Sequence, residues 1–133
     1  MKALKARITK CLNHGSVVET CDNSGAKVVR IVSIKGSKTV RRRKPSCGVS
    51  DLIWVAVQKG ETEMRKQVVP AIVVRQKKEY RRKDGTRIKF ADNAVIILKD
   101  EKGNPKGTMF KGPIAKEVAE RWPAVAKVAS IVV

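Results

Sequence analysis

The sequence is short of aromatic residues, histidine and acidic residues. Two Trp, one Tyr and two Phe make up 4% of the 133 residues, too few for the stacking platforms that read single-stranded bases. The single histidine, His14, enters no Ser-His-Asp arrangement, and the twelve Asp and Glu residues show no paired-carboxylate pattern. The composition therefore argues against an enzyme and against the recognition of bases by stacking.

Long apolar runs and well-spaced metal ligands are also missing. No segment approaches the ~20 apolar residues of a transmembrane helix, and the N-terminus lacks the core of a signal peptide. Cys11, His14, Cys21 and Cys47 are four nominal zinc ligands, but their spacing is poor for a structural zinc site. An odd number of cysteines is typical of the reducing cytosol. We therefore expect a cytoplasmic protein with no metal, no other cofactor and no membrane partner.

Basic residues, in contrast, are abundant. Thirty Lys and Arg residues stand against twelve Asp and Glu, which gives a formal net charge of +18. A small folded chain with this charge repels itself unless a polyanion neutralises it, and nucleic acid is the commonest such partner. Because aromatic residues are scarce, we expect contacts to phosphates and to nucleic-acid shape, with little base readout.

The excess charge gathers in two segments that read as connections between strands. Residues 36–44 hold five basic and no acidic side chains, and residues 75–89 hold eight basic and two acidic side chains. Concentrated charge of one sign is the expected footprint of a nucleic-acid surface. The candidate RNA contacts are Lys27, Lys38, Arg41, Arg42, Arg43, Lys44, Arg75, Lys77, Lys78, Arg81, Arg82, Lys83 and Arg87.

The first two thirds of the chain predict a mainly β fold. Short runs rich in Val and Ile, at 17–21, 27–35, 52–57, 68–74 and 94–98, alternate with turn residues. Five strands in so short a chain favour a closed β-barrel, because closure removes exposed strand edges. Pro70 predicts an edge strand or a bulge in the fourth run. Asp84-Gly85 predicts a projecting basic hairpin over residues 75–90 with a mirror-image turn.

The C-terminal segment changes to a helical period. Pro113 is well placed to begin a helix, and Ile114, Val118 and Trp122 recur every four residues. We expect this apolar face to pack on the barrel, with Pro123 ending the helix or beginning a second one. Lys116, Glu117, Glu120 and Arg121 would then remain outside as a surface for a protein partner. We expect one domain over 1–133, with the barrel in 1–98 and a loop and helical region in 99–133.

Several motifs together resemble one known family. They are residues 21–27 (CDNSGAK), 48–51 (GVSD), 71–75 (AIVVR), Asp84-Gly85 followed by Phe90, Asn93, Val95 and Ile96, then 107–108 (GT) and 112–117 (GPIAKE). They cover nearly the whole chain and are similar to the universal large-subunit ribosomal protein fourteen family. Residues 69–71, 80–85 and 117–123 resemble its archaeal and eukaryotic branch, and the short N-terminus indicates an archaeal source. Ser50 stands where many members carry glycine.

The resemblance implies a five-stranded barrel with a projecting ribbon and a small C-terminal helical region. It implies a structural protein of the large ribosomal subunit that binds 23S-type ribosomal RNA at the face that meets the small subunit. Relatives contribute to bridges between subunits and touch neighbouring ribosomal proteins. In archaea and eukaryotes, the anti-association factor, initiation factor six, docks on the C-terminal part.

Two other classes of function compete with this interpretation. A free RNA chaperone or regulator would carry the same charge, and sedimentation with the large subunit at high salt would discriminate it. An RNA-modifying enzyme with a small accessory barrel is the other class, and the missing catalytic constellation argues against it.

Overall fold

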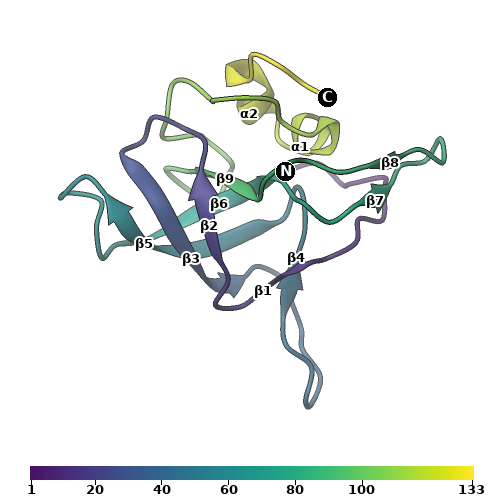
Figure 1. The fold of residues 1–133 in the computed structure, drawn as a ribbon, viewed down its shortest axis with the longest axis horizontal. Coiled ribbons are helices and arrows are strands. Elements are labelled where there is room, and N and C mark those ends of the chain that lie inside the picture. Colours follow the sequence, from purple (N-terminus) through teal and green to yellow (C-terminus); the bar gives the residue numbers. More distant parts are fainter.

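The computed structural model describes all 133 residues and consists of short strands and two short helices (Figure 1). In chain order the elements are β1 (Leu12–Asn13), β2 (Val17–Thr20), β3 (Ala26–Ile34), β4 (Ser46–Cys47), β5 (Leu52–Gly60), β6 (Val68–Arg75), β7 (Tyr80–Arg81), β8 (Arg87–Ile88), β9 (Ala94–Ile97), α1 (Lys116–Arg121) and α2 (Pro123–Val128). Neither helix has the length and apolar character needed to cross a membrane.

Five of the strands close into a barrel in the order β2, β3, β5, β6, β9. Every neighbouring pair is antiparallel except β2 and β9, which run parallel and complete the closure. Closure pairs each of the five strands on both sides, so none of them presents a free edge to another chain. The predicted mainly β fold and the closed five-stranded barrel are confirmed.

The central strands bury both of their faces, which explains their nearly continuous apolar sequence. Val29, Ile53, Val55, Val73 and Ile97 belong to one buried cluster, which draws on all five strands and fills the barrel. The alternate positions of β5, β6 and β9 belong to a second buried cluster on the outside of the barrel, and the helices share it. Because successive side chains of a strand point to opposite faces, alternate residues of these strands pack in the barrel interior and in the outer cluster beneath the helices.

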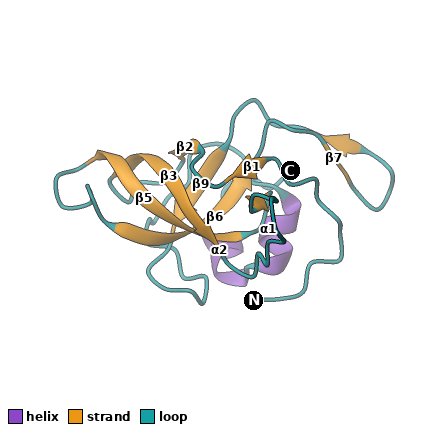
Figure 2. Ribbon diagram, turned by 90° about the horizontal axis from the view of Figure 1, so that it is seen from below, coloured by secondary structure: helices purple, strands orange, loops and turns teal.

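The helices cover this outer face of the barrel. Ile114, Val118 and Trp122 are at most 1% exposed and pack in the outer cluster. Figure 2 shows the two helices together on one side of the barrel. The prediction that this apolar face packs on the barrel is confirmed, and Pro123 begins the second helix at its first position.

Strand β6 departs from the expectation based on Pro70. It lies between β5 and β9 rather than at an edge, so that part of the prediction is wrong. Pro70 stays in the ladder because its carbonyl accepts a hydrogen bond of 2.9 Å from the Leu98 amide. The irregularity of β6 comes later, where its register with β9 shifts between Val73 and Arg75. The basic hairpin begins directly after that shift.

Candidate nucleic-acid interface

Residues 36–44, here called the basic loop, extend from the barrel between β3 and β4 (Figure 1). Its five basic side chains are all exposed, and none of them makes a hydrogen bond or an ion pair within the chain. These side chains are Lys38, Arg41, Arg42, Arg43 and Lys44. Because no acidic neighbour neutralises them, their charge is available to an external anion.

A small ribbon holds the base of the basic loop. Strands β1 and β4 pair antiparallel, with Leu12 opposite Cys47. The His14 amide also donates a hydrogen bond of 3.2 Å to the Pro45 carbonyl. Two-residue strands carry no pattern that sequence reasoning detects, and this ribbon was not predicted. It fixes where the loop leaves the barrel while its tip stays free.

Residues 76–90, the basic hairpin, extend from the barrel in a different direction (Figure 1). Tyr80 pairs with Ile88, and Arg81 pairs with Arg87. The basic side chains of Lys77, Lys78, Arg81, Lys83, Arg87 and Lys89 are exposed. Only Arg87 among these six has an acidic partner, Glu79, at 3.6 Å. The hairpin therefore presents a second surface with little internal neutralisation.

The turn of the hairpin differs from the predicted one. Gly85 has a φ of +90°, but Asp84 is not in the positive-φ region, so the mirror-image turn is wrong. The Gly85 amide donates to the Arg82 carbonyl at 3.0 Å, and the Arg82 amide donates to the Thr86 carbonyl at 2.9 Å. This is the pattern of a three-residue loop with a left-handed last residue. Hydrogen bonds from the Thr86 hydroxyl and amide to Asp84 close the turn and lower the pKa of that carboxyl.

Gln76 anchors the base of the hairpin. Its side chain is fully buried; the Nε2 group donates to the carbonyls of Thr9 at 3.1 Å and Lys78 at 2.9 Å. Its Oε1 accepts a hydrogen bond of 2.9 Å from the Val49 amide, just beyond β4. One side chain thus joins the hairpin, the N-terminal segment and the end of the ribbon beneath the basic loop. The relative placement of the two basic projections depends on it.

Two predicted RNA contacts, Arg75 and Arg82, form ion pairs within the chain. Arg75 is 8% exposed and makes a bidentate pair with Asp92, at 2.9 and 3.0 Å. Its Nη1 also donates to the carbonyls of Lys111 and Pro113, so four of its five N–H donors are already occupied within the chain. Arg82 is largely occupied by Glu117, at 2.8 Å. Acidic partners distant in sequence thus neutralise both arginines, which leaves them less available to RNA than predicted, and their RNA contact stays a prediction.

Lys27 lies apart from both projections, at the start of β3. Its side chain is exposed, as expected for a residue after the turn at 22–25. The remaining predicted contacts, in the basic loop and the hairpin, are all exposed, so the two projections carry most of the candidate surface.

The outer face of α1 keeps only part of the predicted protein-partner surface. Lys116 and Glu120 are exposed and form an i,i+4 ion pair at 3.8 Å. Glu117 is only 4% exposed, and the prediction that it remains outside was wrong. Arg121 is also drawn inward: its guanidinium lies 3.5 Å from Asp51 and donates to the Ser50 carbonyl. The face that remains accessible is therefore smaller than predicted.

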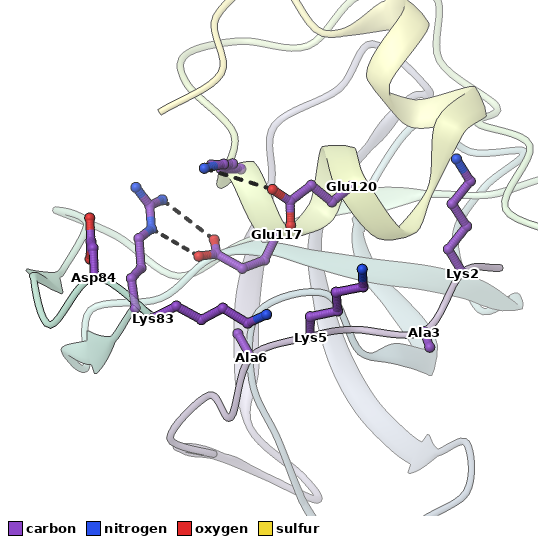
Figure 3. Close-up of a pocket in the computed structure, with 10 residues that line it drawn as sticks. Lys2, Ala3, Lys5, Ala6, Lys83, Asp84, Glu117 and Glu120 are labelled. Carbon is purple, nitrogen blue, oxygen red and sulfur yellow. Dashed lines mark hydrogen bonds and ion pairs between the residues drawn. The ribbon is translucent and has the colours of Figure 1, made fainter.

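A cleft of about 610 Å³ lies beside this helix, between the N-terminal segment, the hairpin tip and α1 (Figure 3). Lys2, Lys5 and Lys83 line it together with Lys116 and Glu120. The Lys2 amide donates to the Arg121 carbonyl at 2.9 Å, which ties the N-terminal segment to the helix. Lys2 and Lys5 were not predicted to belong to a site, because only the fold brings them close to the helix.

The cysteines do not gather into a metal site. Cys11, Cys21 and Cys47 are free, and no group of three or more His, Cys, Asp or Glu side chains is placed to hold an ion. Burial raises the pKa of the Cys21 thiol to about 11 and that of Cys47 to about 12. Thiols with such pKa values are protonated at neutral pH and serve as small apolar side chains.

Comparison with known proteins agrees with the motifs in the sequence. The family described as ribosomal protein L14p/L23e matches residues 11–133. The chain is 54% identical to the large ribosomal subunit protein uL14 of Nanoarchaeum equitans over 133 residues, which is the full length of both chains. It is 50% identical to uL14 of Methanococcus vannielii over 132 residues, 99% of each chain. Both relatives are archaeal, as the resemblance indicated. With nearly the whole chain matched at these identities, the protein belongs to the ribosomal protein L14p/L23e family.

Proposed function

We propose that this chain is a structural constituent of the large ribosomal subunit and that its basic loop and basic hairpin bind phosphates of the ribosomal RNA. The observation that carries the proposal is the state of the basic loop. Its five cations are exposed and unpaired on a segment that projects from a rigid barrel. Such a segment suits a phosphate-lined groove, because each phosphate contact releases condensed counterions. Membership of a ribosomal protein family supports the same function.

The two projections leave the barrel in different directions, so one protein would contact two stretches of RNA (Figure 1). Few aromatic side chains accompany the cations, and Tyr80 in the hairpin is buried. Recognition would therefore rest on phosphate position and RNA shape. This mode suits a protein that meets one folded RNA in a permanent assembly. The site of action is then the ribosome.

The test is sedimentation of an extract from archaeal cells that express a tagged chain. The tagged chain should co-sediment with the large subunit and remain bound through washes at high salt. A free RNA chaperone or regulator would instead stay near the top of the gradient or leave the particle in those washes. That distribution would overturn the ribosomal assignment and favour the alternative function.

The accessible face of α1 and the adjoining cleft form the proposed protein surface. Charges of both signs line it, with Glu120 and Lys116 paired on the helix and Lys83 contributed by the hairpin (Figure 3). Glu120 would repel the phosphates of an RNA backbone, whereas a protein partner can present acidic groups to the lysines and a basic group to Glu120. We assign to this surface initiation factor six, contacts with neighbouring ribosomal proteins and, in the joined ribosome, the small subunit.

Charge reversal separates this partner surface from the RNA surface. Glu120→Lys should slow association of initiation factor six with isolated large subunits, because opposite charges at an interface rim steer the encounter. Glu63→Lys makes the same charge change at an exposed position in the β5–β6 connection and is the matched control. Both variants should assemble normally. If Glu120→Lys blocks assembly and leaves factor binding unchanged, the helix face belongs to the RNA surface instead.

A further inference from the structure

The carboxylate of Glu117 lies where helix α1 meets the basic hairpin. Its Oε2 accepts a hydrogen bond of 2.8 Å from the Tyr80 hydroxyl, and its Oε1 accepts one of 2.8 Å from Nε of Arg82. Arg82 also donates through Nη2 to Oε2 at 3.4 Å and to the Val133 carbonyl at 2.6 Å. Figure 3 shows the Glu117 carboxylate with the dashed lines of these interactions between helix α1 and the hairpin. One side chain of the helix thus binds two residues of the outgoing side of the hairpin, Tyr80 and Arg82.

The surroundings of this carboxylate favour a single geometry. Glu117 is 4% exposed, and Tyr80 is fully buried in the cluster beneath the helices. The Arg82 guanidinium also lies over the Tyr80 ring, 6.0 Å from its centroid. Burial and the neighbouring carboxylate raise the pKa of the Tyr80 hydroxyl, so it stays a donor. A buried charge that loses such partners is strongly unfavourable, so the three side chains move together or not at all.

Other restraints on the hairpin act near its base. Gln76 anchors the outgoing side, and the Phe90 amide donates to the Gln76 carbonyl at 3.0 Å on the returning side. The β7–β8 ladder contains only two residue pairs, and Ile88 packs partly against the core. A two-stranded ribbon of this length has little stability of its own. Beyond its base, the hairpin is joined to the body of the protein by the buried Tyr80 ring, by Ile88 and by the Glu117 carboxylate, which binds both Tyr80 and Arg82.

We propose that Glu117 is a positioning residue for RNA recognition, which aims the basic hairpin at RNA from the neighbouring helix. The inference rests on the proposed function, in which the hairpin contacts ribosomal RNA. Arg81, Lys83 and Arg87 flank the held segment on both sides and carry the exposed charge. With the carboxylate neutralised, the barrel and basic loop stay in place while these charges sample many directions. Glu117 makes no RNA contact itself, because its oxygens are already occupied.

Tethered cleavage tests this with an iron chelate placed at either projection. In a Cys11→Ser background, Thr86→Cys puts the chelate at the hairpin turn and Thr39→Cys puts it in the basic loop; both threonines are exposed. Glu117→Gln keeps the side-chain shape and removes the charge. We expect this variant to lower the intensity of ribosomal RNA cleavage from the hairpin chelate at least threefold. The remaining cleavage should be distributed over more nucleotides. Cleavage from the basic loop should be unchanged.

Two further variants keep the result unambiguous. Glu120→Gln makes the same charge change about one helical turn further along α1, at an exposed position, and it should leave both cleavage patterns intact. Tyr80→Phe removes only the hydroxyl and should spread the hairpin pattern to a smaller extent, even if Glu117→Gln folds poorly. Equal loss of both patterns, or a sharp hairpin pattern in both Glu117→Gln and Tyr80→Phe, would overturn the inference. If the parent with Thr86→Cys cleaves no RNA, the proposed function of the hairpin fails instead.

Discussion

Replacing Ser50 by glycine should stabilise this protein. Ser50 has a φ of +77°, a left-handed conformation that favours glycine. The conformation is imposed by three contacts: the Ser50 amide donates to the Val73 carbonyl at 2.8 Å, while its own carbonyl accepts from Trp122 at 3.0 Å and from Arg121 at 3.3 Å. Ser50 therefore cannot adopt a less strained backbone conformation without breaking the hydrogen bond from the Trp122 indole to its carbonyl.

Two penalties would be removed by Ser50→Gly. The left-handed backbone costs a residue with a Cβ about 1–2 kcal/mol. The Ser50 hydroxyl is fully buried and has no hydrogen-bond partner, a further cost of about 1–3 kcal/mol by mutational measures. Against these, glycine loses more backbone entropy on folding, about 0.5–1 kcal/mol. We expect a net gain of at least about 1 kcal/mol, which corresponds to a rise in Tm of at least roughly 3 °C for a domain of this size.

Ser50→Ala separates the two contributions, because it removes the hydroxyl and keeps the strain. The order of stability should be glycine above alanine above serine, measured by urea denaturation followed by tryptophan fluorescence and by thermal melting. Equal stability of the glycine and alanine variants would refute the argument from backbone strain. A glycine variant less stable than the parent would refute the whole account of this turn.

Three further predictions concern turns and thiols. Gly85→Val should disrupt the hairpin turn, because φ of +90° is strained for a β-branched residue; circular dichroism should show an intact barrel and subunit fractionation a reduced incorporation. Gly103→Ala should destabilise the fold by about 2–4 kcal/mol in thermal melts, because the new Cβ would lie 2.4 Å from the Trp122 ring at a φ of +99°. Iodoacetamide at pH 8 should label Cys11 well before Cys21 and Cys47. Burial raises the pKa of all three thiols, to about 11 for Cys21 and about 12 for Cys47. Cys21 and Cys47 therefore have very little of the reactive thiolate at this pH.

The barrel was predictable because its strands carry their own signal. Runs of β-branched residues at 27–35 and 52–57 predicted β3 and β5, whose observed bounds are Ala26–Ile34 and Leu52–Gly60. The helical period of Ile114, Val118 and Trp122 likewise predicted the packed face. The β1–β4 ribbon has only two residues on each side, too few for any period, so its position depends on tertiary contacts alone.

Charge in the sequence indicated the kind of surface but not the role of each residue. Arg75 and Arg82 lie among basic neighbours and look like RNA contacts. Asp92 is 17 residues from Arg75, and Glu117 is 35 residues from Arg82, so only the fold reveals the pairs. Glu117 was misjudged for the same reason, since a helical period places it between the buried and the exposed face. The basic loop posed no such problem, because no acidic residue lies within it.

The central claim is that the basic loop contacts RNA phosphates, and the salt dependence of binding tests it most directly. The measurement compares the slope of log affinity against log salt concentration on archaeal large-subunit ribosomal RNA fragments. Three variants are needed: the parent, one with Arg41, Arg42 and Arg43 replaced by alanine, and one with Lys99, Lys102 and Lys127 replaced by alanine. The last is the control, with the same loss of charge at exposed positions outside both projections. Loss of three phosphate contacts should flatten the slope by about 2–3 in the loop variant, and the control should keep the parent slope. A loop variant with the parent slope would contradict the account.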